Sequence, residues 1–249
     1  MGNYKLTVCY DGTRYRGWQR QGNTDNTIQA KLEAVLSRLL EQPVDLAASG
    51  RTDAGVHARR QICSFRAETM ADCDVLLSAL RSFLPEDIGA ISLEPAPPRF
   101  HARLSCSGKT YVYRIWNSEA PNVFRRRYML HEGRALDTEA MRLAALPFLG
   151  RHDFAAFCSL KHSKKSTVRE LRDLQITRSG DELRLSFTGD GFLYNMVRLL
   201  TGTLLEVGLH NRAPEDVSLL LQSRDRSLVG PLAPAHGLCL WDVFYETEK

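Results

Sequence analysis

The sequence lacks the short motifs by which many enzymes hold a nucleotide or a metal. Its 249 residues contain no Walker-type glycine-rich phosphate loop and no dinucleotide fingerprint. The six cysteines are scattered, with no Cys-x-x-Cys pair and no Cys/His ligand spacing, which argues against a structural zinc site. We therefore expect no cofactor and no metal, and unpaired thiols are typical of a reducing cytoplasm.

Long apolar runs are also missing. The most apolar stretch, residues 193–209, contains Arg198 and Glu206, so it is too short and too charged to cross a bilayer. Residues 1–10 lack the apolar core of a signal peptide. These absences predict a cytoplasmic protein without a membrane partner.

The net charge of +4 is small, but it is unevenly distributed. Residues 99–127 hold seven basic residues and one acidic residue, and residues 161–172 hold five and one. The rest of the chain is therefore net acidic. Two basic windows suit a surface that binds a polyanion, although solvated loops of an ordinary basic protein explain them about as well.

Hydrophobic periodicity predicts a βαββαβ order in the first part of the chain, which is typical of a ferredoxin-like unit. Strands are expected over residues 4–10, 44–48, 61–66 and 88–93, and helices over residues 27–40 and from Asp72 or Asp74 to Phe83. The order recurs later, with strands over 110–116, 168–178, 182–188 and 238–245 and helices over 137–148, 193–207 and 214–221.

This repeat of architecture predicts an α+β fold with two domains, residues 1–104 and 105–249. We expect the two βαββαβ units to join into one mixed, largely antiparallel sheet, with helices on one side and a central cleft. Ligand sites favour such junctions.

One acidic residue stands out among the candidate catalytic groups. Residues 48–58 read ASGRTDAGVHA and place Asp53 between Gly50 and Gly55. Glycine permits tight or left-handed backbone, so this composition suits a loop that holds one carboxylate in place. A surface turn with a solvated Asp explains the generic Gly-x-x-Asp-x-Gly pattern better, but the full string is more specific.

That string resembles the catalytic loop of the tRNA pseudouridine synthase A family, in which the Asp is the catalytic residue. Three further segments resemble the same family in the same order, so that the resemblance covers essentially the whole chain. They are residues 10–21 (YDGTRYRGWQRQ), residues 100–104 with 109–114 (FHARL and KTYVYR), and residues 191–202 (GFLYNMVRLLTG).

The resemblance implies a pseudouridine synthase fold and the isomerisation of uridine in tRNA. The implied targets are positions thirty-eight to forty of the anticodon stem-loop, and the implied assembly is a homodimer across which the tRNA lies. The reaction needs a positioned carboxylate but no cofactor or metal, because uracil leaves its ribose carbon, rotates and rejoins through carbon without redox change.

Three residues are expected to act beside Asp53. By resemblance Tyr111 stacks on the target base, although Tyr111 and Tyr113 share one strand face and a core aromatic is the simpler explanation of either. Arg198 is implied to pair with Asp53, with a salt bridge to a structural carboxylate as the alternative. Arg51 either takes the place of the flipped base or guides it, or it stabilises the loop.

Contacts to RNA are expected from basic and aromatic residues elsewhere. In residues 10–21 the arginines alternate with Tyr15 and Trp18, which suits phosphate pairing and base packing, although Trp18 equally suits a core position. The expected contact residues are Arg14, Arg16 and Arg20, and Lys164, Lys165 and Arg169 in the basic loop 161–172. The family resemblance also implies an RNA-contacting stretch made of Phe100, His101, Ala102, Arg103 and Leu104.

Two rival functions remain open. A non-catalytic RNA-binding protein of the same fold is the first, and the combined presence of Asp53, Tyr111 and Arg198 argues against it. A carboxylate-dependent hydrolase is the second, and it would need a second acid or a metal cluster, for which no spacing stands out.

Overall fold

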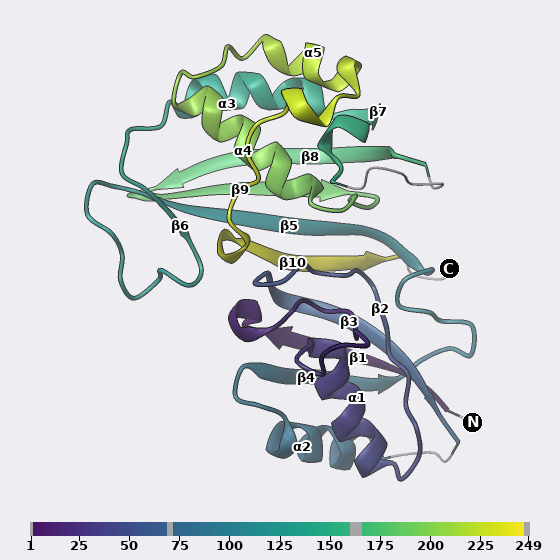
Figure 1. The fold of residues 1–249 in the computed structure, drawn as a ribbon. Helices are drawn as coiled ribbons and strands as arrows, with labels where there is room; N and C mark the ends of the chain where they lie inside the picture. Colours follow the sequence, from purple (N-terminus) through teal and green to yellow (C-terminus); the bar gives the residue numbers. More distant parts are fainter. Residues whose placement is uncertain (1, 69–71, 160–165, 247–249) are drawn as a thin grey trace. The chain divides into compact units, whose positions relative to one another are not determined.

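The computed structural model describes residues 2–68, 72–159 and 166–246, and the chain forms two compact units. The first unit comprises Met1–Ser107 with Cys239–Lys249, and the second comprises Gly108–Leu238. Both units mix helices with largely antiparallel strands, which confirms the α+β class (Figure 1). The joining of the two units into one sheet with a central cleft stays a prediction.

The sheet of the first unit is built on β1 (Gly2–Tyr10), whose alternate residues Tyr4, Leu6, Val8 and Tyr10 are buried. β1 lies between β3 (His57–Ala67) and β4 (Ile88–Pro95), antiparallel to both. The short β2 (Ala47–Ala48) pairs with β3 in antiparallel register. The C-terminal strand β10 (Leu238–Tyr245) pairs with β3 in parallel, so it belongs to this unit and not with the residues that precede it.

Two capped helices complete the first unit. α1 (Ile28–Leu39) starts at Thr27, whose hydroxyl accepts a hydrogen bond from the Ala30 amide, and it buries Leu32 and Leu36. α2 (Cys73–Phe83) is capped by the Asp72 carboxylate, which resolves the choice between Asp72 and Asp74. The order β1-α1-β2-β3-α2-β4 confirms the predicted order (Figure 1).

The second unit has a sheet in the order β5-β9-β8-β7, all antiparallel. Its strands are β5 (Cys106–Asn117), β6 (Leu130–Glu132), which runs parallel to β5, β7 (Gly150–Asp153), β8 (Val168–Ser179) and β9 (Glu182–Gly189). The expected hairpin joins β8 to β9 through Gly180, whose φ is +56°.

Helices α3 (Thr138–Ala145), α4 (Met196–Gly208) and α5 (Asp216–Ser223) gather on one side of this sheet (Figure 1). Asp137 caps α3 as predicted. Short 3-10 turns lie at Gly12–Arg14, Leu146–Phe148, Ala155–Phe157, Arg226–Leu228 and Ala235–Gly237. Within the described ranges, none of the helices combines the length and hydrophobicity that crossing a membrane requires.

Candidate active site

Asp53 lies in a loop of the first unit, residues 49–56, between β2 and β3; we call this segment the acid loop. Asp53 itself is half-buried. The Val56 amide donates a hydrogen bond to the Asp53 carbonyl (3.1 Å), and Gly55 between them adopts a φ of +78°. The tight turn after the acid therefore needs the glycine that the sequence supplies.

Residues 10–18 hold the acid loop from one side. The Trp18 amide donates to the Thr52 carbonyl (3.0 Å), and the hydroxyls of Tyr10 and Thr52 are 2.8 Å apart. Gly17 has a φ of +92°, and a Cβ there would lie 2.9 Å from the Thr52 oxygen and 3.2 Å from the Asp53 carbonyl carbon. Two motifs that are separate in the sequence thus meet directly before the acid.

Gln61 of β3 holds the acid loop from the other side. Its Nε2 donates to the Gly50 carbonyl (2.7 Å), and its Oε1 accepts from the Ser49 hydroxyl (2.6 Å). The same Nε2 lies 3.4 Å from the Tyr10 hydroxyl, so Tyr10, Thr52 and Gln61 form one buried network. A fully satisfied buried network fixes its members in one arrangement, and here it fixes the loop that carries Asp53.

The arginines within residues 10–21 differ in their ion-pair partners. Arg14 pairs with Asp87 (2.7 Å) and Arg20 with Glu33 (3.1 Å). Arg16 is exposed, and its guanidinium has no hydrogen-bond or ion-pair partner among the described residues. Trp18 is 1% exposed and packs near the Tyr10 ring, so it is a core residue. Arg51 in the acid loop is exposed.

The stretch 100–104 forms a turn with an inner and an outer side. Phe100 packs against Tyr245, and Ala102 is fully buried, with its amide bonded to Ser64 Oγ. His101 Nδ1 accepts hydrogen bonds from the amides of Arg103 and Leu104, so this ring nitrogen stabilises the turn. The two outward residues are Arg103 and Leu104, and Leu104 is 80% exposed.

The two tyrosines of β5 have different surroundings in the second unit. Tyr113 is fully buried and its hydroxyl donates to the Pro234 carbonyl (2.8 Å). Burial raises the pKa of the Tyr113 phenol, and the positive charge of Arg198 lowers it in part. Tyr111, also buried, meets the Phe192 ring edge-on, with centroids 5.2 Å apart at 85°.

Arg198 lies in the first turn of α4 and is held in one orientation. Its Nε donates to the Ala233 carbonyl (2.7 Å) and its Nη1 to Asn195 Oδ1 (3.2 Å). Asn195 adopts a φ of +62° just before the helix, and its Nδ2 donates to Ser159 Oγ (3.0 Å). Asn tolerates this left-handed backbone better than most residues. The expected pairing of Arg198 with Asp53 stays a prediction.

The basic loop 161–172 is only partly within the described residues. Lys164 and Lys165 lie outside them. Arg169 donates to the carbonyls of Ser166 (3.0 Å) and Val168 (2.6 Å), and its side chain lies beside Gly191, the first residue of the third motif. The contacts of this loop with RNA stay a prediction.

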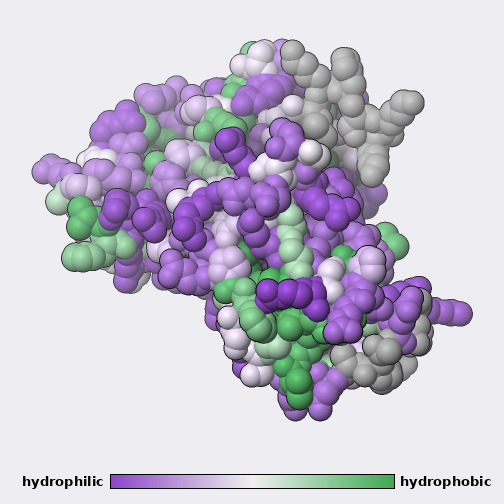
Figure 2. All heavy atoms as spheres, turned by 60° about the horizontal axis from the view of Figure 1, so that its bottom comes forward, coloured by the Kyte–Doolittle hydropathy of each residue, from purple (hydrophilic) through white to green (hydrophobic). Residues whose placement is uncertain are grey.

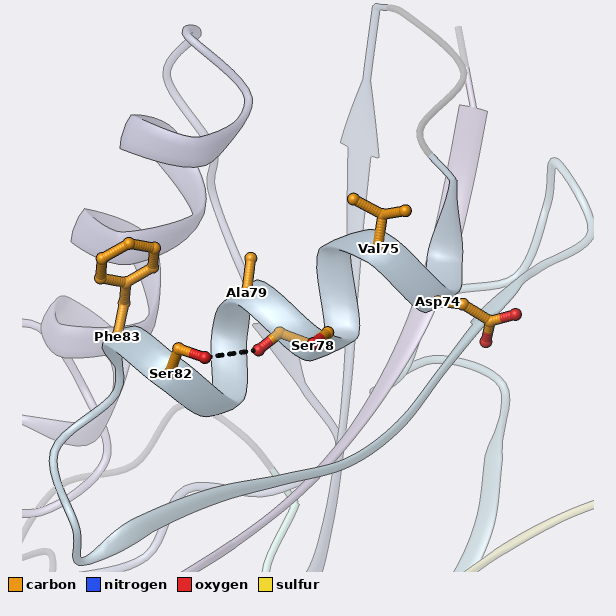
Figure 3. Close-up of a pocket in the computed structure, with 6 residues that line it drawn as sticks. All are labelled: Asp74, Val75, Ser78, Ala79, Ser82 and Phe83. Atoms are coloured by element: carbon orange, nitrogen blue, oxygen red, sulfur yellow. Dashed lines mark hydrogen bonds between the residues drawn. The ribbon is translucent and has the colours of Figure 1, made fainter.

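A hollow of about 610 Å³ lies on the outer face of α2, apart from the acid loop (Figure 3). Its lining includes the exposed Val75 and Phe83 and one carboxylate, Asp74, but no basic side chain, so it does not suit RNA phosphates. Figure 2 shows hydrophobic residues concentrated on the face that carries this helix. Across the described ranges, no cluster of three His, Cys, Asp or Glu residues suits a metal ion.

Sequence reasoning singled out the acid but missed the residues that hold it. Tyr10, Gly17 and Asn195 lie in the recognised motifs but had no predicted role, and Gln61 was predicted only as the first residue of a strand. The residue type was the available signal for Gly17, since glycine is the usual residue where the backbone is left-handed or another segment approaches closely. A carboxylate on a loop fixed in this way can attack a sugar carbon or exchange a proton.

Comparisons with known proteins place this chain among characterised relatives. The chain is 42% identical over 243 residues to "tRNA pseudouridine synthase A 2" of Bacillus anthracis, covering 98% of this chain and 99% of that protein. It is 43% identical over 245 residues to "tRNA pseudouridine synthase A" of Bacillus sp. (strain KSM-64), covering 98% and 100%.

Among solved structures, the "Crystal Structure of a Cbf5-Nop10-Gar1 Complex" contains a chain that matches 81% of this chain and 45% of its own length. The identity is 12% and the TM-score 0.37, so this likeness is too distant to inform the site. A family model described as tRNA pseudouridine synthase matches residues 6–104 and 144–246, and with the two bacterial relatives it shows that the chain belongs to the tRNA pseudouridine synthase family.

Proposed function

We propose that this protein isomerises uridine to pseudouridine in tRNA, with Asp53 as the catalytic carboxylate. The observation that carries the proposal is the fixation of the acid loop by Tyr10, Gly17 and Gln61. A solvated surface Asp without a function would not need a buried hydrogen-bond network on both sides of its loop. A catalytic group, in contrast, must be held close to one productive geometry.

The reaction breaks the bond from the ribose carbon to a ring nitrogen and forms one from the same ribose carbon to a ring carbon. A proton leaves that ring carbon and the nitrogen is left protonated, so atoms and electrons balance without an oxidant. One carboxylate suffices, either as a nucleophile toward the sugar or as a base that takes the proton. No cofactor enters these steps.

Tyr111 and Arg198 complete the proposed site. Tyr111 stacks on the target base, and its contact with Phe192 ties it to the motif that contains Arg198. Arg198 pairs with Asp53 and keeps the carboxylate ionised, because a nearby positive charge favours the charged form. Its hydrogen bonds to Ala233 and Asn195 support this role, since they leave the guanidinium little freedom to turn.

The proposed substrate region is the anticodon stem-loop, with tRNA positions thirty-eight to forty as the targets. Arg16, Arg51 and Arg103 are exposed and suit contacts to phosphates, and Arg51 also guides or replaces the flipped base. We further propose that the enzyme is a homodimer that works in the cytoplasm. Sedimentation at several protein concentrations, with and without tRNA, measures the oligomeric state.

The test is incubation of the protein with unmodified tRNA transcripts, followed by carbodiimide treatment and primer extension. Pseudouridine-dependent stops are expected in the anticodon arm with the wild type and none with Asp53→Asn, which preserves the size of the side chain. Binding of the same transcripts by both proteins is measured in parallel. Equal stops from both, or no stops from either, would refute the proposal, and binding without stops would favour a non-catalytic RNA-binding protein.

A further inference from the structure

Residues 118–128, in the connection between β5 and β6, expose an aromatic ring beside three arginines; we call this segment the arginine loop. Phe124 is 93% exposed, and Val123 and Tyr128 are exposed beside it. Arg125, Arg126 and Arg127 follow Phe124 directly. The loop lies between the two stretches that the family model matches, residues 6–104 and 144–246.

The arginine loop is ordered by hydrogen bonds to the flanking strands and within the loop itself. The Trp116 indole donates to the Ala120 carbonyl (2.9 Å), and His131 Nε2 lies 2.8 Å from the Ser118 carbonyl. Within the loop, the Tyr128 amide donates to the Arg125 carbonyl (2.8 Å). The backbone that carries the exposed Phe124 ring is therefore a defined turn. Figure 1 shows the loop extending beyond the end of β5, and Figure 2 shows hydrophobic residues among strongly hydrophilic ones at that end.

Positive charge dominates the base of the arginine loop. The Glu182 carboxylate accepts Arg125 (3.0 Å), Arg114 (2.8 Å) and Arg184 (2.5 Å), so one negative charge is shared by three positive ones. Arg126 is exposed, and its guanidinium donates to the Val123 carbonyl, which leaves its charge uncompensated by that contact. Glu119 is the one acidic residue within the loop. Such a surface attracts a polyanion.

We propose that the arginine loop binds the RNA substrate, with Phe124 stacking on an unpaired base and Arg125 and Arg126 contacting the neighbouring phosphates. The identity of that RNA as tRNA rests on the proposed function. Proteins that bind single-stranded RNA combine a basic groove with aromatic side chains, because every base offers a π-face for stacking. An exposed ring on an ordered basic loop has this combination.

A second copy of the chain fits the arginine loop less well. In a two-fold symmetric contact the same patch meets itself, so the excess of arginines on one copy would face the excess on the other. Like charges brought together in this way cost free energy. The charge of the loop therefore favours nucleic acid over self-association.

The test compares the full-length wild type, Phe124→Ala, Phe124→Trp and Arg126→Ala for binding to an unmodified tRNA transcript at several salt concentrations. Phe124→Ala is expected to raise Kd roughly five- to 150-fold, the range for loss of one stacked base, and Phe124→Trp is expected to bind like the wild type. Arg126→Ala is expected to lower the slope of log K against log salt by about 1, whereas Phe124→Ala leaves that slope unchanged.

Leu219→Ala on α5 is the matched control, because Leu219 is also large, apolar and 65% exposed. It should bind tRNA like the wild type. Unchanged binding by Phe124→Ala would overturn the proposal, as would a loss of affinity that accompanies dissociation of a dimer in sedimentation, which would make the loop a protein contact. Pseudouridine formation is measured separately, so a wild type that binds through Phe124 without forming product refutes the proposed function and not the loop.

Discussion

The hydroxyl groups of Tyr10 and Thr52 lie 2.8 Å apart, and this hydrogen bond ties the end of β1 to the residue that directly precedes Asp53. Both residues are buried, and Gln61 reaches the same tyrosine hydroxyl. The position of the acid thus depends on a strand more than forty residues away in the sequence. Gly55, with a φ of +78°, permits the turn after Asp53, and the network fixes the residues before it.

Tyr10→Phe should lower the free energy of unfolding by about 1 kcal/mol, because the Thr52 hydroxyl loses a buried partner. We expect kcat to fall more than KM changes, since a loosened acid loop affects the position of Asp53 and not the contacts to RNA. Urea unfolding and pseudouridine formation under saturating tRNA measure the two effects.

Ser37→Ala is the control for Tyr10→Phe, because it removes a hydroxyl that accepts the Val44 amide (2.9 Å) elsewhere in the same unit. It should cost a similar free energy of unfolding and leave kcat unchanged. An equal loss of kcat in both variants would mean that stability, and not the position of the acid loop, sets the rate.

Gly17→Ala should damage the acid loop more severely. The alanine meets a left-handed backbone and a Cβ contact of 2.9 Å with the Thr52 carbonyl, so the loop has to move. Gly180→Ala is matched to it, since Gly180 has a positive φ but nothing within 4 Å of a Cβ. Left-handed backbone alone costs alanine about 1–2 kcal/mol. We expect the free energy of unfolding of both variants to fall by at least this much, and the kcat of Gly17→Ala to fall as well.

Thermal unfolding and activity assays of the two glycine variants separate the effect of the left-handed backbone from the effect of the Cβ contact with Thr52. Full activity in Gly17→Ala at a temperature where the variant remains folded would show that the acid loop tolerates the shift. In that case the contact between residue 17 and the loop would have no catalytic consequence.

Much of the fold could be predicted because the signals are local. Asp137 begins a helix where a side chain accepts the first free amides, and the Ser179–Asp181 turn marks the β8–β9 hairpin. Long-range pairing could not be predicted in this way. β3 begins at His57, four residues before the predicted start, because it continues into the pairing of His57 with Cys239.

The site shows the same division. The catalytic role of Asp53 stays a prediction from its motif. The apolar pattern placed the start of the helix within residues 191–202 at residue 193, whereas α4 begins at Met196. The cause is the positive φ of Asn195, which hydrophobic periodicity does not reveal. The bond from Arg198 to Asn195 Oδ1 depends on that backbone conformation, so it also escaped prediction.

Asn195→Ala should lower kcat, because it removes the acceptor of Arg198 Nη1 and puts alanine in a left-handed conformation. Asn195→Gly removes the same acceptor and relieves the backbone strain. We expect the glycine variant to be more stable than the alanine variant by about 1 kcal/mol, and both to have a similarly reduced kcat. Recovery of full activity by Asn195→Gly would show that the backbone, and not the contact with Arg198, is the function of Asn195.

Glu182 should stabilise the second unit in a pH-dependent way. Burial raises the pKa of this carboxyl, but the hydrogen bonds and charges of Arg114 and Arg184 outweigh burial and lower the pKa to about 2. A carboxyl whose folded pKa is depressed stabilises the fold above its ordinary pKa of 4.5, and this stabilisation is lost as the pH falls toward the folded value. The stability of the wild type should therefore decline between pH 4.5 and about 2.

Glu182→Gln should lower the free energy of unfolding at pH 7 by about 2–4 kcal/mol, since three arginines then lie together without their shared anion. The difference from the wild type should shrink as the pH falls below 4.5, which urea unfolding at stepped pH measures. Glu132→Gln is the control, because its pair with Arg134 is largely exposed on the arginine side and should contribute less than about 1 kcal/mol. A constant difference between wild type and Glu182→Gln from pH 7 to pH 3 would show that packing, and not the ionised carboxylate, accounts for the loss.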